Sequence, residues 1–71
     1  MKRKNLIKFR TDLGLKSKEF AEKLDVSRVH YSDIENGKSN PSFGFITKFE
    51  KVCQEMNKEI DDIWELFKVS E

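Results

Sequence analysis

Apolar residues recur along the front of this chain at spacings of three and four, the period of an amphipathic helix. Leu6, Phe9 and Leu13 form the first such set, and Gly14 follows it directly. Glycine adopts the left-handed backbone conformation without a steric penalty, so we expect Gly14 to end a first helix. No alternation of apolar and polar residues is long enough to indicate a strand, and the pattern predicts an all-α protein.

A second helix is predicted from Phe20, Ala21 and Leu24, which again have helical spacing. Its start is less clear. Lys16 lies three residues before a glutamate, at the position of an N-cap, but a lysine side chain cannot accept the capping hydrogen bond. Ser17 can accept it, which would start the helix one residue later.

A third, short helix follows after a very brief turn. Asp25 can adopt the left-handed conformation in that turn, and Ser27 can cap the new helix. Tyr31 and Ile34 lie on one side of it and are expected to be buried. The sequence Asn36-Gly37 is a stop signal. The opposite, outward side carries Val29, Ser32, Asp33 and Asn36, with Arg28 at its edge.

Two more helices are expected in the second half of the chain. Ser42 can cap a fourth helix, and we assign its apolar stripe to Phe43, Ile46, Phe49, Val52, Cys53 and Met56. Phe45 lies off that stripe. A fifth helix at about residues 60–68 is predicted from Ile60, Ile63, Trp64 and Phe67. The five helices complete one domain that spans residues 1–71.

Composition narrows the classes of function. A 71-residue chain buries only roughly 60% of its unfolded surface, so its core is marginal and oligomerisation would add stability. Cys53 is the single cysteine, and with one histidine no metal-binding spacing is present. We therefore expect no metal and no cofactor. The sequence also has no glycine-rich phosphate loop and no nucleophile-elbow pattern, so we expect no enzymatic activity. No apolar run reaches the roughly 20 residues of a membrane span, and a cytoplasmic location is expected.

Charge is distributed unevenly although the net charge is only +1. Residues 1–38 contain ten Lys or Arg against six Asp or Glu, whereas residues 39–71 contain four against seven. A basic front and an acidic back suit a protein that presents one face to a polyanion, although two ordinary solvated surfaces would give the same counts.

The short turn between the second and third helices has the spacing of a helix-turn-helix, at about residues 17–36. The second helix of that motif enters the DNA major groove, which is about 12 Å wide and accepts an α-helix. Its outer face then needs short or polar side chains in front of a buried apolar side. The third helix has this pattern, so its outer face is predicted to contact base edges.

The stretch LGLKSKEFAEKLDVSRVHYSDIENGKSNPS resembles the helix-turn-helix module of the phage Cro/C1 repressor family, also called the XRE family. The resemblance runs from about Leu6 to Ser42 and is most specific in IENGKSNPS. It implies a five-helix, lambda-repressor-like fold and a DNA-binding transcriptional regulator, usually a homodimer on a palindromic operator. Family pattern and sequence differ at Ser17, where the family usually has glutamine, and at Asp25, where it usually has glycine.

The resemblance also implies site residues. The positions where the family contacts bases are Ser27, Arg28, Val29, Ser32 and Asp33. The positions that lie close to phosphates are Ser17, Asn36, Lys38 and Asn40.

We expect a repressor that acts as a homodimer, with Ile63, Trp64 and Phe67 in the dimer interface. An alternative for Trp64 is a place in the core of the single chain. The alternative function is a protein-interaction module, such as an antitoxin that binds a toxin and autoregulates its operon. The acidic C-terminal third and Trp64 would then be the contact surface, and co-purification of a stoichiometric basic partner would favour this alternative.

Overall fold

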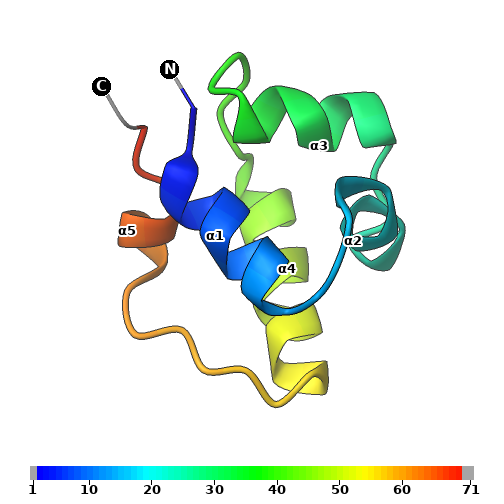
Figure 1. Ribbon diagram of the computed structural model, residues 1–71, viewed down its shortest axis with the longest axis vertical. Coiled ribbons are helices and arrows are strands. Elements are labelled where there is room, and N and C mark those ends of the chain that lie inside the picture. Colours follow the sequence, from blue (N-terminus) through cyan, green and yellow to red (C-terminus); the bar gives the residue numbers. More distant parts are fainter. Residues whose placement is uncertain (1, 70–71) are drawn as a thin grey trace.

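Five α-helices make up the regular secondary structure of residues 2–69, the part of the chain that the computed structural model describes (Figure 1). They are α1 (Lys4–Asp12), α2 (Ser17–Lys23), α3 (Arg28–Glu35), α4 (Phe43–Glu55) and α5 (Ile63–Leu66). The predicted all-α fold with five helices is confirmed. Figure 1 shows α3 across one end of the molecule and the loop between α4 and α5 at the opposite end.

The helix ends follow the signals in the sequence. Gly14 and Asp25 both have positive φ, at 76° and 58°, in the turns where left-handed residues were expected. The Ser27 hydroxyl accepts a hydrogen bond from the amide of His30 at 3.1 Å and so caps α3. Ser42 caps α4 in the same way, accepting from the amide of Phe45 at 3.1 Å.

The start of α2 differs from the prediction that Ser17 is its cap. Ser17 is the first helical residue, and Lys16 occupies the N-cap position without a side-chain hydrogen bond. The carboxylate of Glu19 instead accepts from the Lys16 amide at 2.9 Å, which is the reciprocal half of a capping box. This bond satisfies the backbone amide of Lys16, although the lysine side chain cannot accept a hydrogen bond from the amides of the first turn.

The core lies between α4 and the helix-turn-helix. Its buried apolar residues come from every helix except α5 and are Leu6, Phe20, Ala21, Leu24, Tyr31, Ile34, Phe45, Phe49, Val52 and Cys53, joined by Phe67 just after α5. Phe49 is central, because its ring centroid lies 5.6 Å from that of Phe20 and 5.1 Å from that of Phe67. Both contacts are edge-to-face, the arrangement that aromatic pairs prefer.

The apolar stripe of α4 differs at its first turn from the predicted one. Phe43 is 87% exposed, whereas Phe45 is 3% exposed and stacks near Tyr31 and Phe49. Phe43 precedes Phe49 by six residues, which places the two side chains about 120° apart around the helix. Phe45 precedes Phe49 by four, only about 40° away. The prediction that Phe43 lies on the apolar stripe of α4 and Phe45 off it was therefore wrong.

The last helix is shorter than the predicted range of 60–68. It spans Ile63–Leu66, and the Asp62 carboxylate caps it by accepting from the Trp64 amide at 3.0 Å. Phe67 is 6% exposed and belongs to the core, so its assignment to a dimer interface is corrected. Trp64 is 74% exposed, which excludes the alternative that it is core within a single chain.

A buried ion pair ties α1 to α3. Arg10 Nε donates to Glu35 Oε2 at 2.7 Å, and the Tyr31 hydroxyl donates to the same oxygen at 2.6 Å. Burial, together with the hydrogen bond to Glu35, raises the pKa of Tyr31 well above its ordinary value. The triad holds α3 in a fixed orientation on the body of the protein.

None of the helices between residues 2 and 69 has the length and apolar character that crossing a bilayer requires.

Candidate nucleic-acid interface

A tight turn sets the angle between α2 and α3. Leu24 ends α2 as its C-cap, and Asp25 reverses the chain with its positive φ. The amide of Val26 then donates back to the carbonyl of Ala21 at 3.1 Å, a closing bond of the kind that ends helices with a left-handed residue. The turn is short because Ser27 already caps the next helix. The predicted helix-turn-helix is therefore present, with its second helix on the molecular surface.

The two sides of α3 differ sharply in exposure. Tyr31 and Ile34 are fully buried against the core, as predicted. On the outer side Arg28 is exposed and Val29 is 71% exposed, although valine gains nothing from contact with water. Ser27, Arg28 and Val29 thus lie together at the exposed N-terminal end of α3, with Ser32 and Asp33 half-buried one turn further along.

A compact loop continues this surface beyond the end of α3. The carbonyl of Asp33 accepts from the amides of Lys38 and Ser39, at 2.8 and 3.2 Å, after Gly37 has reversed the chain with φ +77°. The backbone of Lys38 is therefore fixed close to the outer face of α3 while its side chain is exposed. Lys38, a predicted phosphate contact, therefore lies next to Asp33, a predicted base contact.

Asn36 joins the same group of residues. Its side-chain amide donates to the Ser32 hydroxyl at 3.4 Å, a long bond within the last turn of α3. Asn36 and Ser32 are both half-buried. Ser17 lies apart from them at the start of α2, half-buried, and its hydroxyl makes no hydrogen bond to another residue of the described range.

The N-terminal segment contains one residue that the sequence pattern did not indicate. Arg3 is 2% exposed, and its guanidinium lies behind the loop that follows α3. It donates to the carbonyls of Ile34 and Ser39 and to the side-chain oxygen of Asn40. Nothing in the basic run at the start of the chain distinguishes Arg3 from its neighbouring lysines, because the partners are more than 30 residues away.

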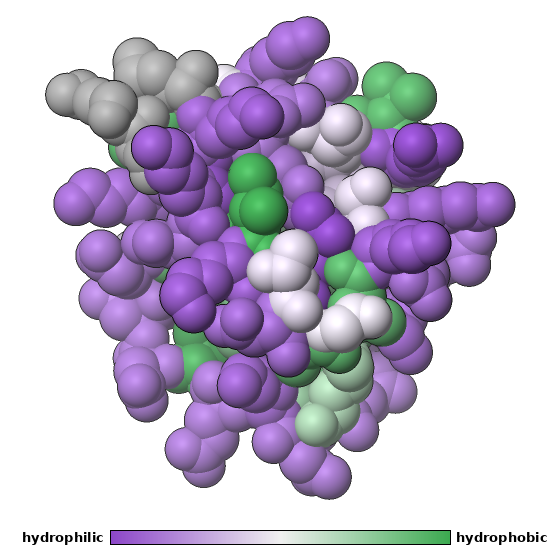
Figure 2. Space-filling view, viewed as in Figure 1, coloured by the Kyte–Doolittle hydropathy of each residue, from purple (hydrophilic) through white to green (hydrophobic). Residues whose placement is uncertain are grey.

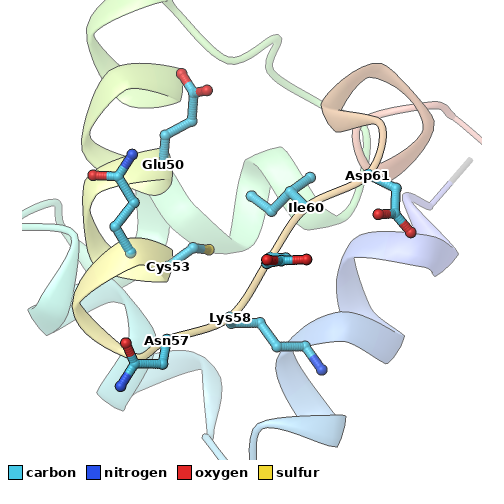
Figure 3. Close-up of a pocket in the computed structure, with 8 residues that line it drawn as sticks. Glu50, Cys53, Asn57, Lys58, Ile60 and Asp61 are labelled. Atoms are coloured by element: carbon cyan, nitrogen blue, oxygen red, sulfur yellow. The ribbon is translucent and has the colours of Figure 1, made fainter.

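A surface hollow lies away from α3, between α4 and the loop that follows it (Figure 3). Figure 3 shows Cys53 and Ile60 directed toward the gap and Lys58 extending toward α1. Burial raises the pKa of the Cys53 thiol to about 11, so it is a poor nucleophile at neutral pH. In residues 2–69 no three His, Cys, Asp or Glu side chains are grouped so that they could hold a metal ion.

Figure 2 shows a face that is mostly hydrophilic, with small, separated hydrophobic patches. Among residues 2–69, the strongly exposed large apolar side chains are Val29 on α3, Phe43 at the start of α4 and Trp64 on α5.

Comparison with known proteins identifies the family. A family model described as helix-turn-helix matches residues 6–55, from α1 to the end of α4. The Control protein C.MunI of Mycoplasma sp is 45% identical to this chain over 51 residues, which cover 72% of this chain and 62% of that protein. The chain thus spans less than two thirds of that relative's length, and no solved structure matches it. With the geometry of α2 and α3, these matches show that the chain belongs to the helix-turn-helix family of the Cro/C1 type.

Proposed function

We propose that this protein is a transcriptional regulator that binds double-stranded DNA in a sequence-specific manner through the outer face of α3. The observation that carries the proposal is the exposure of Arg28 and Val29 on a helix whose opposite side is fully buried. A helix presented in this way fits the major groove, where each base pair offers a distinct pattern of donors, acceptors and methyl groups. Similarity to a protein named as a control protein supports a regulatory role.

Each residue of the outer face has a chemistry that suits base edges. Arg28 can donate two hydrogen bonds to a guanine, the commonest specific contact of arginine. Val29 can contact a thymine methyl group, and Asp33 can accept from a cytosine amino group. Ser27 and Ser32 supply short hydroxyls that either donate or accept.

The phosphate contacts come from residues around this face. Lys38 and Asn40 are exposed on the loop after α3, and Asn36 closes that helix. Ser17 would approach a phosphate from the N-terminus of α2, where the helix dipole favours an anion. Such contacts set the orientation of the protein on the duplex without specifying its sequence.

We further propose that the regulator is a homodimer on a palindromic operator and that it represses by occupying a promoter. Trp64 supports a dimer, because a single chain leaves its large apolar surface in water. Ile63 is half-buried beside it and would form the edge of the contact. A two-fold axis would place two α3 helices in successive major grooves, about 34–36 Å apart.

Selection of bound sequences from a random pool of duplex DNA tests the proposal. We expect a recovered motif with two-fold symmetry and half-site centres about 10 base pairs apart. Recovery of no sequence preference at all would refute sequence-specific binding. A single non-palindromic motif, bound by a chain that sediments as a monomer, would refute the dimer and leave the DNA-binding role standing.

A second candidate function has its own observation. Trp64 is exposed on α5, close in sequence to the exposed acidic residues Glu59, Asp61, Asp62 and Glu65. This surface would suit a basic protein partner, as in an antitoxin that binds a toxin. Co-purification of a stoichiometric basic protein whose binding is lost in Trp64→Ala would favour this function.

A further inference from the structure

The guanidinium of Arg3 is held from several sides. Its Nε donates to the carbonyl of Phe67 at 2.8 Å, and Nη1 donates to the carbonyl of Ser39 at 3.0 Å and to that of Ile34. Its Nη2 donates to the side-chain Oδ1 of Asn40 at 3.1 Å. Four of the five N–H donors of the arginine are thus used, on oxygens from three segments of the chain.

The backbone of Arg3 is fixed as well, because its amide donates to the carbonyl of Glu35 at 2.7 Å. The residue therefore packs against the C-terminal end of α3, where unpaired carbonyls favour a positive charge. A guanidinium that is bonded on so many sides has one orientation, and it presents a donor at a fixed point beside Asn40.

This donor determines how the Asn40 carboxamide is turned. A carboxamide carries one oxygen acceptor and one NH2 donor group, and a guanidinium can only donate. Rotating the Asn40 amide by half a turn would bring two donor groups together, so Oδ1 must face Arg3. The NH2 group consequently faces away from Arg3, on a residue that is exposed at the surface.

We infer that Arg3 is a positioning residue for DNA binding, which turns the two N–H donors of Asn40 outward so that they can donate to a DNA phosphate. The inference rests on the proposed function of α3 and of the loop after it. Phosphate oxygens only accept hydrogen bonds, so an amide turned the other way would present the wrong group. Arg3 itself is buried and acts only through Asn40.

Asn40→Asp separates this role from a purely structural one. The new carboxylate would face Arg3 as Oδ1 does now, and the neutral hydrogen bond would become a charge-assisted one, which is stronger. The variant should therefore unfold at the same temperature as the wild type or higher. It would also replace the outward donors with a negative charge, which repels phosphate.

The experiment measures thermal unfolding and the affinity for a random-sequence duplex over a range of salt concentrations. For Asn40→Asp we expect undiminished thermal stability, at least a tenfold loss of affinity at low salt, and a salt slope reduced by about 1. Asn57→Asp is the matched control, since it makes the same charge change at an exposed asparagine beyond α4. Its affinity should stay within twofold of the wild type.

A second pair of variants tests whether Arg3 acts through Asn40. Arg3→Lys keeps the positive charge but not the guanidinium geometry, and it should weaken binding in the wild-type background. In an Asn40→Ala background the same change should cause no further loss. Equal losses of DNA affinity in both backgrounds would overturn the inference. So would an Asn40→Asp variant that binds DNA as tightly as Asn57→Asp, or one that unfolds at a lower temperature than the wild type. If the wild type bound no duplex, the proposed function would fail first, and the inference with it.

Discussion

At the scale of single residues, Arg28 and Lys38 occupy two different positions in one small surface. Arg28 begins the outer face of α3, whereas Lys38 lies in the loop that packs back on the carbonyl of Asp33. In the proposed complex the first position would face base edges, and the second would face the sugar-phosphate backbone. These two kinds of contact differ in their effect on specificity.

Arg28→Ala should lower the affinity for the selected operator by about 1–3 kcal/mol and relax the preference at one base pair in each half-site. Lys38→Ala is the contrasting variant. It should weaken binding to all DNA sequences alike and reduce the slope of affinity against salt concentration by about 1. Binding titrations with the operator and with base-substituted duplexes measure both effects. An unchanged sequence preference in Arg28→Ala would show that this face does not contact bases.

The residues that the sequence did not reveal are those whose partners are distant in the chain. Periodicity correctly indicated that Tyr31 is buried, because its neighbours in the pattern lie on the same helix. The pattern did not indicate that its hydroxyl meets Glu35 and Arg10, since that contact depends on how α1 packs on α3. The burial of Arg3 could not be predicted for the same reason. Its burial depends on the loop after α3 and on the segment after α5.

At the scale of elements, local signals located the helix ends well. The capping serines of α3 and α4 and the left-handed residues Gly14 and Asp25 were predicted correctly, because each depends only on the residues beside it. The predicted cap Ser17 was the exception, since it is the first residue of α2. The predicted apolar stripe of α4 was wrong at Phe43. Phe43 lies three residues before Ile46, and each step of three residues moves a side chain by about 60° around the helix. The extent of α5 could not be found from four apolar residues, since packing against α1 decides which of them are helical.

Two substitutions can separate the observed capping role of Ser27 from its proposed role in DNA binding. Ser27→Ala removes the cap of α3 and should lower the free energy of unfolding by about 1 kcal/mol. Ser27→Asp retains a capping oxygen, so stability should be kept while the added negative charge weakens DNA binding. Chemical denaturation and binding titrations measure the two effects. Equal affinity of Ser27→Asp and the wild type would place residue 27 outside the interface.

Because the thiol of Cys53 on α4 is buried, we expect the protein to lose stability in alkaline solution. Burial raises the pKa of Cys53 from 9.0 to about 11 in the folded state. The unfolded thiol loses its proton first, so rising pH favours unfolding through this interval. The free energy of unfolding should fall by about 2–3 kcal/mol between pH 8 and 11. Ionisation of Tyr31 in the unfolded state adds to the loss above about pH 10.

Denaturation at a series of pH values checks this prediction, with Cys53→Val as the control variant. Valine is similar in size and carries no ionisable group, so its stability should change little between pH 8 and 10. If the control and the wild type lost stability in parallel over that range, the thiol would not be the cause.

At the scale of the whole molecule, two separate parts of the protein surface have separate proposed tasks. The end formed by α3 carries the candidate DNA surface, and α5 carries the exposed Trp64. Because Trp64 contributes little to the core of the single chain, Trp64→Ala should fold with the stability of the wild-type monomer.

We expect Trp64→Ala to dissociate at concentrations where the wild type is dimeric and to lose operator affinity steeply, because each dimer makes its half-site contacts twice. Sedimentation at micromolar concentration measures the association, and binding to an isolated half-site is the control that should be unchanged. A wild type that sediments as a monomer at these concentrations would contradict the dimer.

The most direct test of the central claim is a titration of isotope-labelled protein with duplex DNA, followed by the NMR signals of the backbone amides. If α3 and the loop after it form the interface, the largest shifts will belong to residues 27–33 and 36–40. The amides of residues 57–62, at the opposite end of the molecule, should scarcely move. Shifts concentrated at residues 57–66, with α3 unaffected, would contradict the account.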